Sequence, residues 1–266
     1  VKITPAHDPN DFEVGQRHQL ETIVIMNKDG TMNEKAGKYA GMDRYEARKA
    51  IIADFKEAGP LVKIEETKHA VGHCSRCKTV VEPMTTQQWF VKMKPLAGPA
   101  MEAVTSGKTK FVPERFSKTY IQWLSNIHDW CISRQRSWGV PIPAFYCDDC
   151  GKWVITDETM KKVEEIVEKE GTDAWWAHSA EELLPEGFKC PHCGGTHFHK
   201  EKDIMDVWFD SGSTWNGVLR YPHEDWKEDG VQFPADLYLE GSDQHRGWFH
   251  SSLLCSVAVN GYAPYK

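Results

Sequence analysis

Apolar residues recur every three or four positions in several stretches of the chain, a spacing typical of helices with one buried face. The stretch 41–59 begins with Asp43 and Glu46, spaced as in a capping box, and ends at Gly59. Similar patterns predict helices over 95–107, 113–127 and 157–171. The residues expected on the buried face of the first helix are Ala47, Ile51, Phe55 and Ala58, and on that of the last helix Met160, Val163 and Val167.

Short apolar runs between turn residues predict strands. They occupy 1–5, 21–26 and 88–93, and the second is followed by a turn at 27–30, while HDPND (7–11) is interpreted as a polar loop. The stretch 235–261 predicts a buried strand, a tight turn and a helix that Gly261 closes. Helices and strands thus alternate, which favours an α/β or mixed fold.

The composition is that of a folded protein outside the membrane, and it does not indicate a particular binding partner. The 266 residues are 40% hydrophobic and include 11 Trp, enough for one large core or several small ones. The net charge of −7 provides no general basic surface for nucleic acid, although a local basic face is compatible with it. No apolar run of about 18 residues and no leader-like segment occurs, so we expect a cytoplasmic protein that does not enter a membrane.

Cysteine spacing points to a metal. Six of the eight cysteines form three Cys-x-x-Cys pairs, a pattern of metal sites rather than of disulfides. Two of these pairs are followed by glycine and have 39 residues between them, and four thiolates in tetrahedral geometry select Zn²⁺. We therefore predict a closed, structural zinc site, the alternative being a ribbon that has lost its metal. Its ligands are Cys147, Cys150, Cys190 and Cys193, whereas Cys74 and Cys77 form a half-site.

The turn after the strand predicted near 235–240 has ligand-binding chemistry. In open α/β sheets, ligands bind where a strand ends and a helix begins. Gly241 permits close approach of a backbone, and Glu240, Asp243 and Gln244 offer acceptors for ribose hydroxyls or an ammonium group. The alternative makes Asp243 a helix N-cap and Gln244 a surface residue.

Three motifs together carry a family resemblance. They are DWCISRQRSWG (129–139), DVWFDSGST (206–214) and LEGSDQHRGWF (239–249). In this order they resemble the isoleucyl and valyl subgroup of class I aminoacyl-tRNA synthetases. The resemblance implies that ATP, with Mg²⁺, and an amino acid form an adenylate, from which the acyl group moves to tRNA.

The resemblance also implies an architecture. It is an α/β fold: the second half of a Rossmann-type catalytic domain with a zinc-ribbon insertion, preceded by part of a mixed α/β editing (CP1) domain. The implied segments are 1–70 for the editing domain, 71–128 for a connection with the half zinc hairpin, 129–146 for catalytic core, 147–203 for the zinc ribbon and 204–266 for the strand–turn–helix.

Site residues follow by position in the motifs. Glu240, Gly241, Asp243 and Gln244 would hold the ribose and the amino-acid end of the adenylate. Trp208 and Trp248 would form walls of the side-chain pocket, although without the resemblance core packing is the favoured interpretation for both.

The first residues, VKITPAHDPNDFEVG, resemble the editing domain. There Asp11 would bind the α-ammonium of a wrongly attached amino acid, with Lys2 beside it and His7 and Asp8 on the same loop. The alternative is an Asx-rich turn in which Asp8 and Asp11 accept backbone N–H groups.

Up to about residue 129 the sequence resembles valyl-tRNA synthetases more closely, and after that residue it resembles isoleucyl-tRNA synthetases. Because the later half carries the amino-acid pocket, we expect isoleucine and tRNA(Ile) as substrates of a monomeric enzyme, with valine and tRNA(Val) as the alternative.

Neither the HIGH nor the KMSKS signature of class I synthetases occurs in the chain. We therefore expect an internal portion of an enzyme that does not activate amino acids by itself. Two other functions fit some features: a zinc-stabilised RNA-binding module, suggested by Arg134, Arg136 and Trp138, and a free-standing hydrolase of mis-acylated tRNA.

Overall fold

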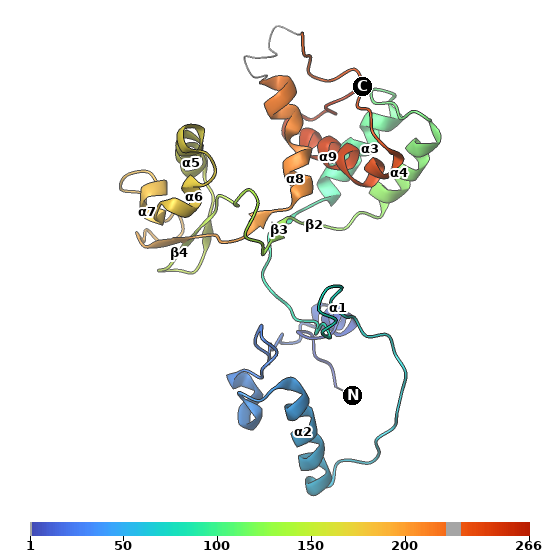
Figure 1. Ribbon diagram of the computed structural model, residues 1–266, viewed down its shortest axis with the longest axis vertical. Helices are drawn as coiled ribbons and strands as arrows, with labels where there is room; N and C mark the ends of the chain where they lie inside the picture. The colour runs from blue at the N-terminus through green and yellow to red at the C-terminus, as the bar shows by residue number, and fades with distance from the viewer. Residues whose placement is uncertain (1, 222–229) are drawn as a thin grey trace. The chain divides into compact units, whose positions relative to one another are not determined.

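The computed structural model describes residues 2–221 and 230–266. The chain divides into two compact units, Val1–Gln87 and Gln88–Lys266, which we describe separately (Figure 1). None of the helices in the described part of the chain is long and apolar enough to cross a membrane.

The first unit contains helices α1 (Pro9–His18) and α2 (Arg44–Ala58) and the 3₁₀ helix η1 (Glu34–Tyr39). The strands predicted at 1–5 and 21–26 are wrong: residues 2–5 and 21–26 form no strand, and Val1 lies outside the described residues. The second run makes one isolated bridge, Met26 to Met32, across the predicted turn at 27–30. Strand-like sequence without a neighbouring strand to pair with does not build a sheet.

Helix α1 replaces the polar loop predicted at 7–11. Asp8 is its N-cap and accepts the N–H of Asp11 at 2.9 Å, and Pro9 occupies the first turn, where its missing N–H costs nothing. The helix lies close to the preceding chain, since a Cβ added at Gly15 would be 2.8 Å from Pro5 Cγ. An Asp–Pro pair is a helix-start signal that the sequence interpretation overlooked.

Helix α2 has the predicted limits. Asp43 accepts the N–H of Tyr45 at 2.8 Å, and Gly59 ends the helix with a φ of 87°. The capping box is wrong, because the carboxylate of Glu46 binds Lys49 at 2.8 Å on the helix surface. Phe55, expected on the buried face, is 50% exposed, so α2 has a much smaller buried face than its periodicity predicts.

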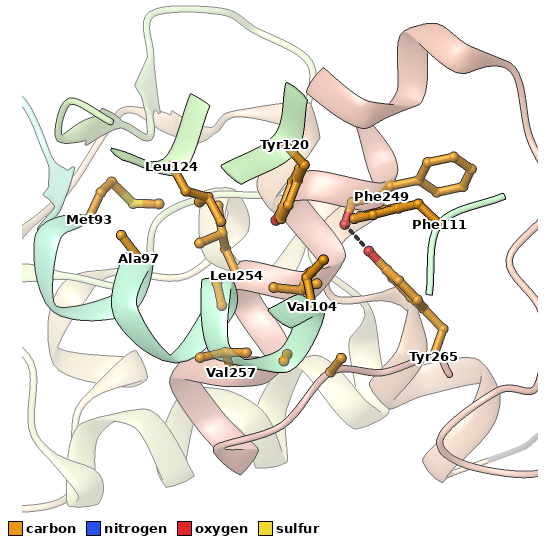
Figure 2. Packing of buried hydrophobic residues seen from close by; sticks show 14 residues of the cluster. Met93, Ala97, Val104, Phe111, Tyr120, Leu124, Phe249, Leu254, Val257 and Tyr265 are labelled. Carbon is orange, nitrogen blue, oxygen red and sulfur yellow. Dashed lines mark hydrogen bonds between the residues drawn. The ribbon is translucent and has the colours of Figure 1, made fainter. Parts of the chain in front are cut away.

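The second unit has a helical core. It packs α3 (Lys94–Thr105), α4 (Arg115–Ser125) and α9 (Trp248–Asn260) around buried apolar side chains (Figure 2). Helix α8 (Val207–Gly212) lies against α9. Tyr265 donates its hydroxyl to the carbonyl of Phe249 at 2.8 Å within this core. The helices predicted at 95–107 and 113–127 are confirmed, and Gly261 ends α9 as predicted.

Two short antiparallel ladders support this core. β1 (Phe90–Val91) pairs with β2 (Trp130–Cys131), and β3 (Ser133–Arg134) pairs with β7 (Ile204–Met205). The strand predicted near 235–240 is wrong; the one parallel contact recorded among the described residues is the bridge Ala235–Tyr265. Because a central parallel strand requires neighbours, Leu239 remains 80% exposed instead of buried. The chain continues into the 3₁₀ helix η4 (Ser242–Arg246), and a π-helix, η2 (Trp215–Arg220), follows α8.

Residues 145–200, which we call the cysteine ribbon, form a second core. Its antiparallel sheet has the order β5 (Trp153–Val154), β4 (Phe145–Cys147) and β6 (Phe198–Lys200). Helices α5 (Asp157–Glu170), α6 (Ala174–Ala177) and α7 (Ala180–Leu183) are inserted between β5 and β6 and cover it. Helix α5 confirms the predicted helix, although Met160 is exposed rather than inward.

The packing of this core predicts that two substitutions on α9 change the free energy of unfolding by very different amounts. Leu253 is fully buried, so Leu253→Ala should lower the free energy of unfolding by about 2–5 kcal/mol. Val259, on the same helix, is 70% exposed, and Val259→Ala should change it by no more than about 0.5 kcal/mol. Urea unfolding of the 266-residue chain measures both; equal effects would contradict this packing of α9.

Candidate functional site

Four cysteines of the ribbon meet at one point. The sulfur atoms of Cys147, Cys150, Cys190 and Cys193 all lie within 4.8 Å of one another. Two of these pairs join the two knuckles, the turns 147–151 and 190–194: Cys147 to Cys193 at 3.6 Å and Cys150 to Cys190 at 3.8 Å. Two of the four, Cys147 and Cys190, are buried. The structure therefore brings together all four predicted ligands.

Each knuckle is a tight turn that requires its glycine. Gly151 and Gly194 have φ angles of 68° and 78°, and their N–H groups return to the carbonyls of Cys147 and Cys190 at 2.8 Å. In the second knuckle, the N–H groups of His192 and Gly195 point at the sulfur atoms of Cys190 and Cys193 at 3.4 Å. His192 thus contributes through its backbone.

The thiols of the cluster respond to this environment in different ways. Burial raises the pKa of Cys147. Burial also opposes ionisation of Cys190, but N–H groups from His192 and Cys193 outweigh it and lower the pKa of that thiol to about 7. A metal would complete the ionisation of the other thiols, because thiolates are the binding form.

The Cys74–Cys77 pair lies in the first unit. The Thr79 hydroxyl, 3.3 Å from Cys77 Sγ, together with the Thr79 amide, lowers the pKa of Cys77 to about 7. His73, beside the pair, is engaged through Nδ1 with the Lys78 carbonyl at 2.7 Å. Within the described residues, only the four ribbon cysteines form a group of three or more potential metal ligands.

Lys2 and Asp11, the predicted editing residues, converge on Thr4. One Asp11 carboxylate oxygen accepts the Thr4 N–H at 2.7 Å and the Thr4 hydroxyl at 3.2 Å. Lys2 donates to the same hydroxyl at 3.1 Å. Thr4 was not singled out from the sequence, because nothing in the local pattern marks it. The Asx-turn alternative is partly confirmed, since Asp8 caps α1 and Asp11 accepts a backbone N–H.

His7 has a structural role in the same segment. Its Nε2 accepts the N–H of Ile25 at 3.1 Å, so Nδ1 carries the proton and donates to the carbonyl of Pro83 at 3.0 Å. One imidazole therefore joins three parts of the first unit.

The four residues predicted for the adenylate lie in and around η4. Glu240 accepts the N–H of Gly241 at 2.8 Å, and Asp243 accepts from the side-chain amide of Gln244 at 3.2 Å. Gln244 in turn accepts the N–H of Trp248 at 2.8 Å and so caps α9. The alternative that made Asp243 the N-cap and Gln244 a plain surface residue is wrong.

The two candidate pocket tryptophans occupy different surroundings. Trp208 lines a cavity of about 390 Å³ and lies against Gly247, where an added Cβ would be 2.9 Å from its ring. Trp248 stacks on Tyr238 with ring centroids 4.1 Å apart and donates its indole N–H to the carbonyl of Ser211 at 3.1 Å. Glu240 lines a second cavity, of about 560 Å³.

Asp206 is a residue that the sequence interpretation missed. It is 5% exposed and accepts from Arg134 at 2.7 Å, from the Trp130 indole at 3.0 Å and from the Trp208 N–H at 3.1 Å. It therefore fixes the backbone from which Trp208 projects. Burial, reinforced by the charge of Asp206, raises the pKa of Asp210 to about 6. An Asp two residues before Trp208, at a helix start, was the available signal.

The residues that suggested an RNA-binding module, Arg134, Arg136 and Trp138, are only partly available to bind a ligand. Arg134 is held by Asp206, whereas Arg136 and Trp138 are exposed. Arg134, one of the two cations in this set, therefore has a structural role.

Comparisons with known proteins agree on a family. The family model described as tRNA synthetases class I (I, L, M and V) matches residues 10–266. The isoleucine–tRNA ligase of Carboxydothermus hydrogenoformans is 48% identical over 266 residues, which cover 100% of this chain and 28% of the relative. The isoleucine–tRNA ligase of Caldicellulosiruptor bescii is 47% identical, with coverage of 100% and 28%.

A valine enzyme is almost as similar. The valine–tRNA ligase of Carboxydothermus hydrogenoformans is 46% identical over 266 residues, covering 100% of this chain and 27% of the relative. Among solved structures, the LeuRS of a LeuRS–tRNA–LeuAMS complex from Agrobacterium radiobacter K84 matches 98% of this chain and 25% of its own, at 19% identity and a TM-score of 0.32, too low to define the fold.

The chain spans a little over a quarter of the length of the curated relatives that it matches. The match of the family model to almost every residue, and identities of 46–48% over the full 266 residues, show that this chain belongs to the class I tRNA synthetases of the I, L, M and V group.

Proposed function

We propose that this chain is a portion of an isoleucine–tRNA ligase. In the whole enzyme, ATP with Mg²⁺ and isoleucine form isoleucyl-adenylate and pyrophosphate, and the isoleucyl group then passes to tRNA(Ile). The observation that carries the proposal is the 48% identity to an isoleucine–tRNA ligase along the entire chain. The proposal includes a cytoplasmic, monomeric enzyme.

We assign residues 129–146 and 204–266 of the second unit to the second half of a Rossmann-type catalytic domain, with the ribbon as an insertion. Trp208 and Trp248 border the isoleucine side chain, and Glu240, Gly241, Asp243 and Gln244 hold the adenylate. Support comes from the cavity beside Trp208 and from the buried carboxylate of Asp206, which orients the start of α8.

We assign a structural Zn²⁺ to Cys147, Cys150, Cys190 and Cys193. Four cysteine sulfurs grouped within 4.8 Å fit a tetrahedral thiolate site, and a site with four protein ligands has no position for a reacting water. When bound, the ion joins the two knuckles and stabilises the fold of the ribbon. It takes no part in amino-acid activation.

The zinc assignment predicts one equivalent of metal per chain. Cys190→Ser should remove tight binding, whereas Cys77→Ser should leave the stoichiometry unchanged because the Cys74–Cys77 pair offers only half a site. Elemental analysis after dialysis against a weak chelator measures both. Two equivalents in the unsubstituted chain, or loss of metal in Cys77→Ser, would contradict the assignment.

The catalytic assignment predicts different behaviour for part and whole. The 266-residue chain should show no isoleucine-dependent exchange of pyrophosphate into ATP, because the HIGH and KMSKS segments that contact the triphosphate in the family are absent from it. The complete gene product containing this chain should show such exchange. Activity of the isolated chain, or none in the complete product, would contradict the assignment.

Valine is the alternative substrate, favoured by the 46% identity to a valine–tRNA ligase. The same exchange assay separates the two amino acids. One methylene in an apolar pocket is worth about 1–3 kcal/mol, a limit for which isoleucyl enzymes themselves are the standard example. A higher kcat/KM for isoleucine than for valine supports our assignment, and the reverse order supports the alternative.

We assign residues 1–70 to part of an editing (CP1) domain in which Asp11 binds the α-ammonium of a mis-attached amino acid and Lys2 assists. The convergence of Lys2, Thr4 and Asp11 supports this role, since the charged groups lie together at one hydroxyl. A carboxylate that fixes the ammonium group would place the ester for attack by water.

Editing can be tested in the complete gene product. Asp11→Ala should slow deacylation of Val-tRNA(Ile) about 10- to 100-fold, because a hydrogen bond to a charged group is worth about 1.5–3 kcal/mol. Thr4→Val is the matched variant: it removes the hydroxyl between Lys2 and Asp11 and keeps both charges. Thr4→Val also keeps the Thr4 N–H bond to Asp11, so it should slow deacylation much less than Asp11→Ala. Unchanged deacylation by the folded Asp11→Ala enzyme, or an equal loss in Thr4→Val, would contradict the editing role.

A further inference from the structure

We infer that Asp149 is a positioning residue that holds the two cysteine knuckles in register, so that the four sulfur atoms are placed for a metal before it arrives. The inference rests on the zinc site proposed above and adds a residue that is not itself a ligand. Its basis is one carboxylate that links the interior of the first knuckle to the chain leaving the second.

The contacts of Asp149 cross between the knuckles. It lies between Cys147 and Cys150, and one of its oxygens accepts the backbone N–H groups of Thr196 at 3.1 Å and His197 at 3.4 Å. The other oxygen lies 3.1 Å from Nδ1 of His197. Hydrogen bonds to an ionised acceptor are about twice as strong as those between neutral groups.

Gly195 makes this approach feasible. A Cβ at Gly195 would overlap the Asp149 carboxylate, so the carboxylate lies directly against the backbone of that residue. The N–H of Gly195 points at the sulfur of Cys193 at 3.4 Å. The carboxylate therefore supports the peptide that orients the last ligand of the second knuckle.

The sheet by itself does not provide this link. Pairing of β4 with β6 sets Cys147 opposite Phe198, and the Asp148 N–H reaches the carbonyl of His197 at 2.9 Å. These bonds fix the chain after residue 196, whereas Cys193 lies in the turn before it. Asp149 bridges this interval, which contains Gly195 and Thr196.

Charge and position predict opposite effects on metal binding. Asp149 adds a negative charge near four thiolates, with one oxygen 4.0 Å from the sulfur of Cys147. If the main effect of Asp149 were its charge, removing the carboxylate would reduce the repulsion among the negative groups and tighten zinc binding. If its main effect is to position the second knuckle, removing the carboxylate loosens that knuckle and weakens zinc binding.

Asp148 is a matched control. It is the preceding residue in the same knuckle, has the same side chain and is similarly exposed. Its carboxylate binds only a side chain of β6, Nδ1 of His199 at 2.5 Å, and none of the peptides next to Cys193 among the described contacts. Substituting it changes the local charge equally but leaves the proposed link intact.

The experiment measures Zn²⁺ affinity of the 266-residue chain by competition with a chromophoric chelator. We expect Asp149→Ala to weaken binding about 10- to 100-fold, as is typical when a group that orients metal ligands is lost, and Asp148→Ala to change it less than about threefold. Asp149→Asn, which keeps the size and one acceptor oxygen, should fall between them. Gly195→Ala, which displaces the carboxylate, should weaken binding like Asp149→Ala.

Unchanged or tighter zinc binding in Asp149→Ala would overturn the inference, as would an equal loss in Asp148→Ala. If Asp149→Ala does not fold, Asp149→Asn and Gly195→Ala decide by the same criterion. Absence of zinc binding in the unsubstituted chain would instead refute the proposed metal site, so the two failures are distinguishable.

Discussion

The candidate catalytic part of the chain depends on the ion pair between the buried carboxylate of Asp206 and Arg134. A carboxylate that is 5% exposed must be compensated, and Arg134, the Trp130 indole and the Trp208 N–H do so from two segments more than 70 residues apart in the sequence. Between these segments lies the whole cysteine ribbon. The ion pair therefore closes the base of the insertion and, in the same contact, sets the start of α8 and the direction of Trp208. Removing either partner would leave an unpaired charge, so a change at this point affects the cavity beside Trp208 as well as stability.

In the ribbon, the two cysteine knuckles must be brought together although three helices, rather than a short loop, separate them in the sequence. Its own apolar core, with Trp175, Phe145 and Leu183 fully buried, lets the insertion hold its shape around the cysteines. The sheet then aligns the knuckles at one end, and Asp149 extends that alignment to the second pair of sulfurs. Local stability of the insertion and the geometry of the cysteine cluster are thus linked.

Sequence reasoning worked where the determinants were local. Asp43, Gly59 and Gly171 mark helix limits through contacts within a few residues, and the Cys-x-x-Cys-Gly spacing fixes a knuckle by itself. It was wrong where partners decide. The run near 235–240 has strand-like alternation, but strand formation depends on neighbouring strands that no local pattern reveals. The pairing of Asp206 with Arg134 was missed for the same reason, whereas its cap on the start of α8 was locally readable. Capping at Asp8 was an oversight, because Asp–Pro before a helical pattern was readable.

The residues assigned to the adenylate show how a family assignment and a geometry complement each other. Glu240, Asp243 and Gln244 are each engaged in a hydrogen bond with a residue close in sequence, and Gln244 caps α9 through its carbonyl oxygen. Hydrogen bonds to a charged group contribute about 1.5–3 kcal/mol each, but Glu240 and Asp243 are exposed and can exchange theirs for equivalent bonds to a ribose at small net cost. Gln244 differs, because exchanging its bond would uncap the helix that carries Trp248. We therefore expect Gln244 to act through its side-chain amide N–H groups, which already donate to Asp243, while its oxygen stays on α9. Gln244 is thus the member of the set whose orientation is already fixed by the fold.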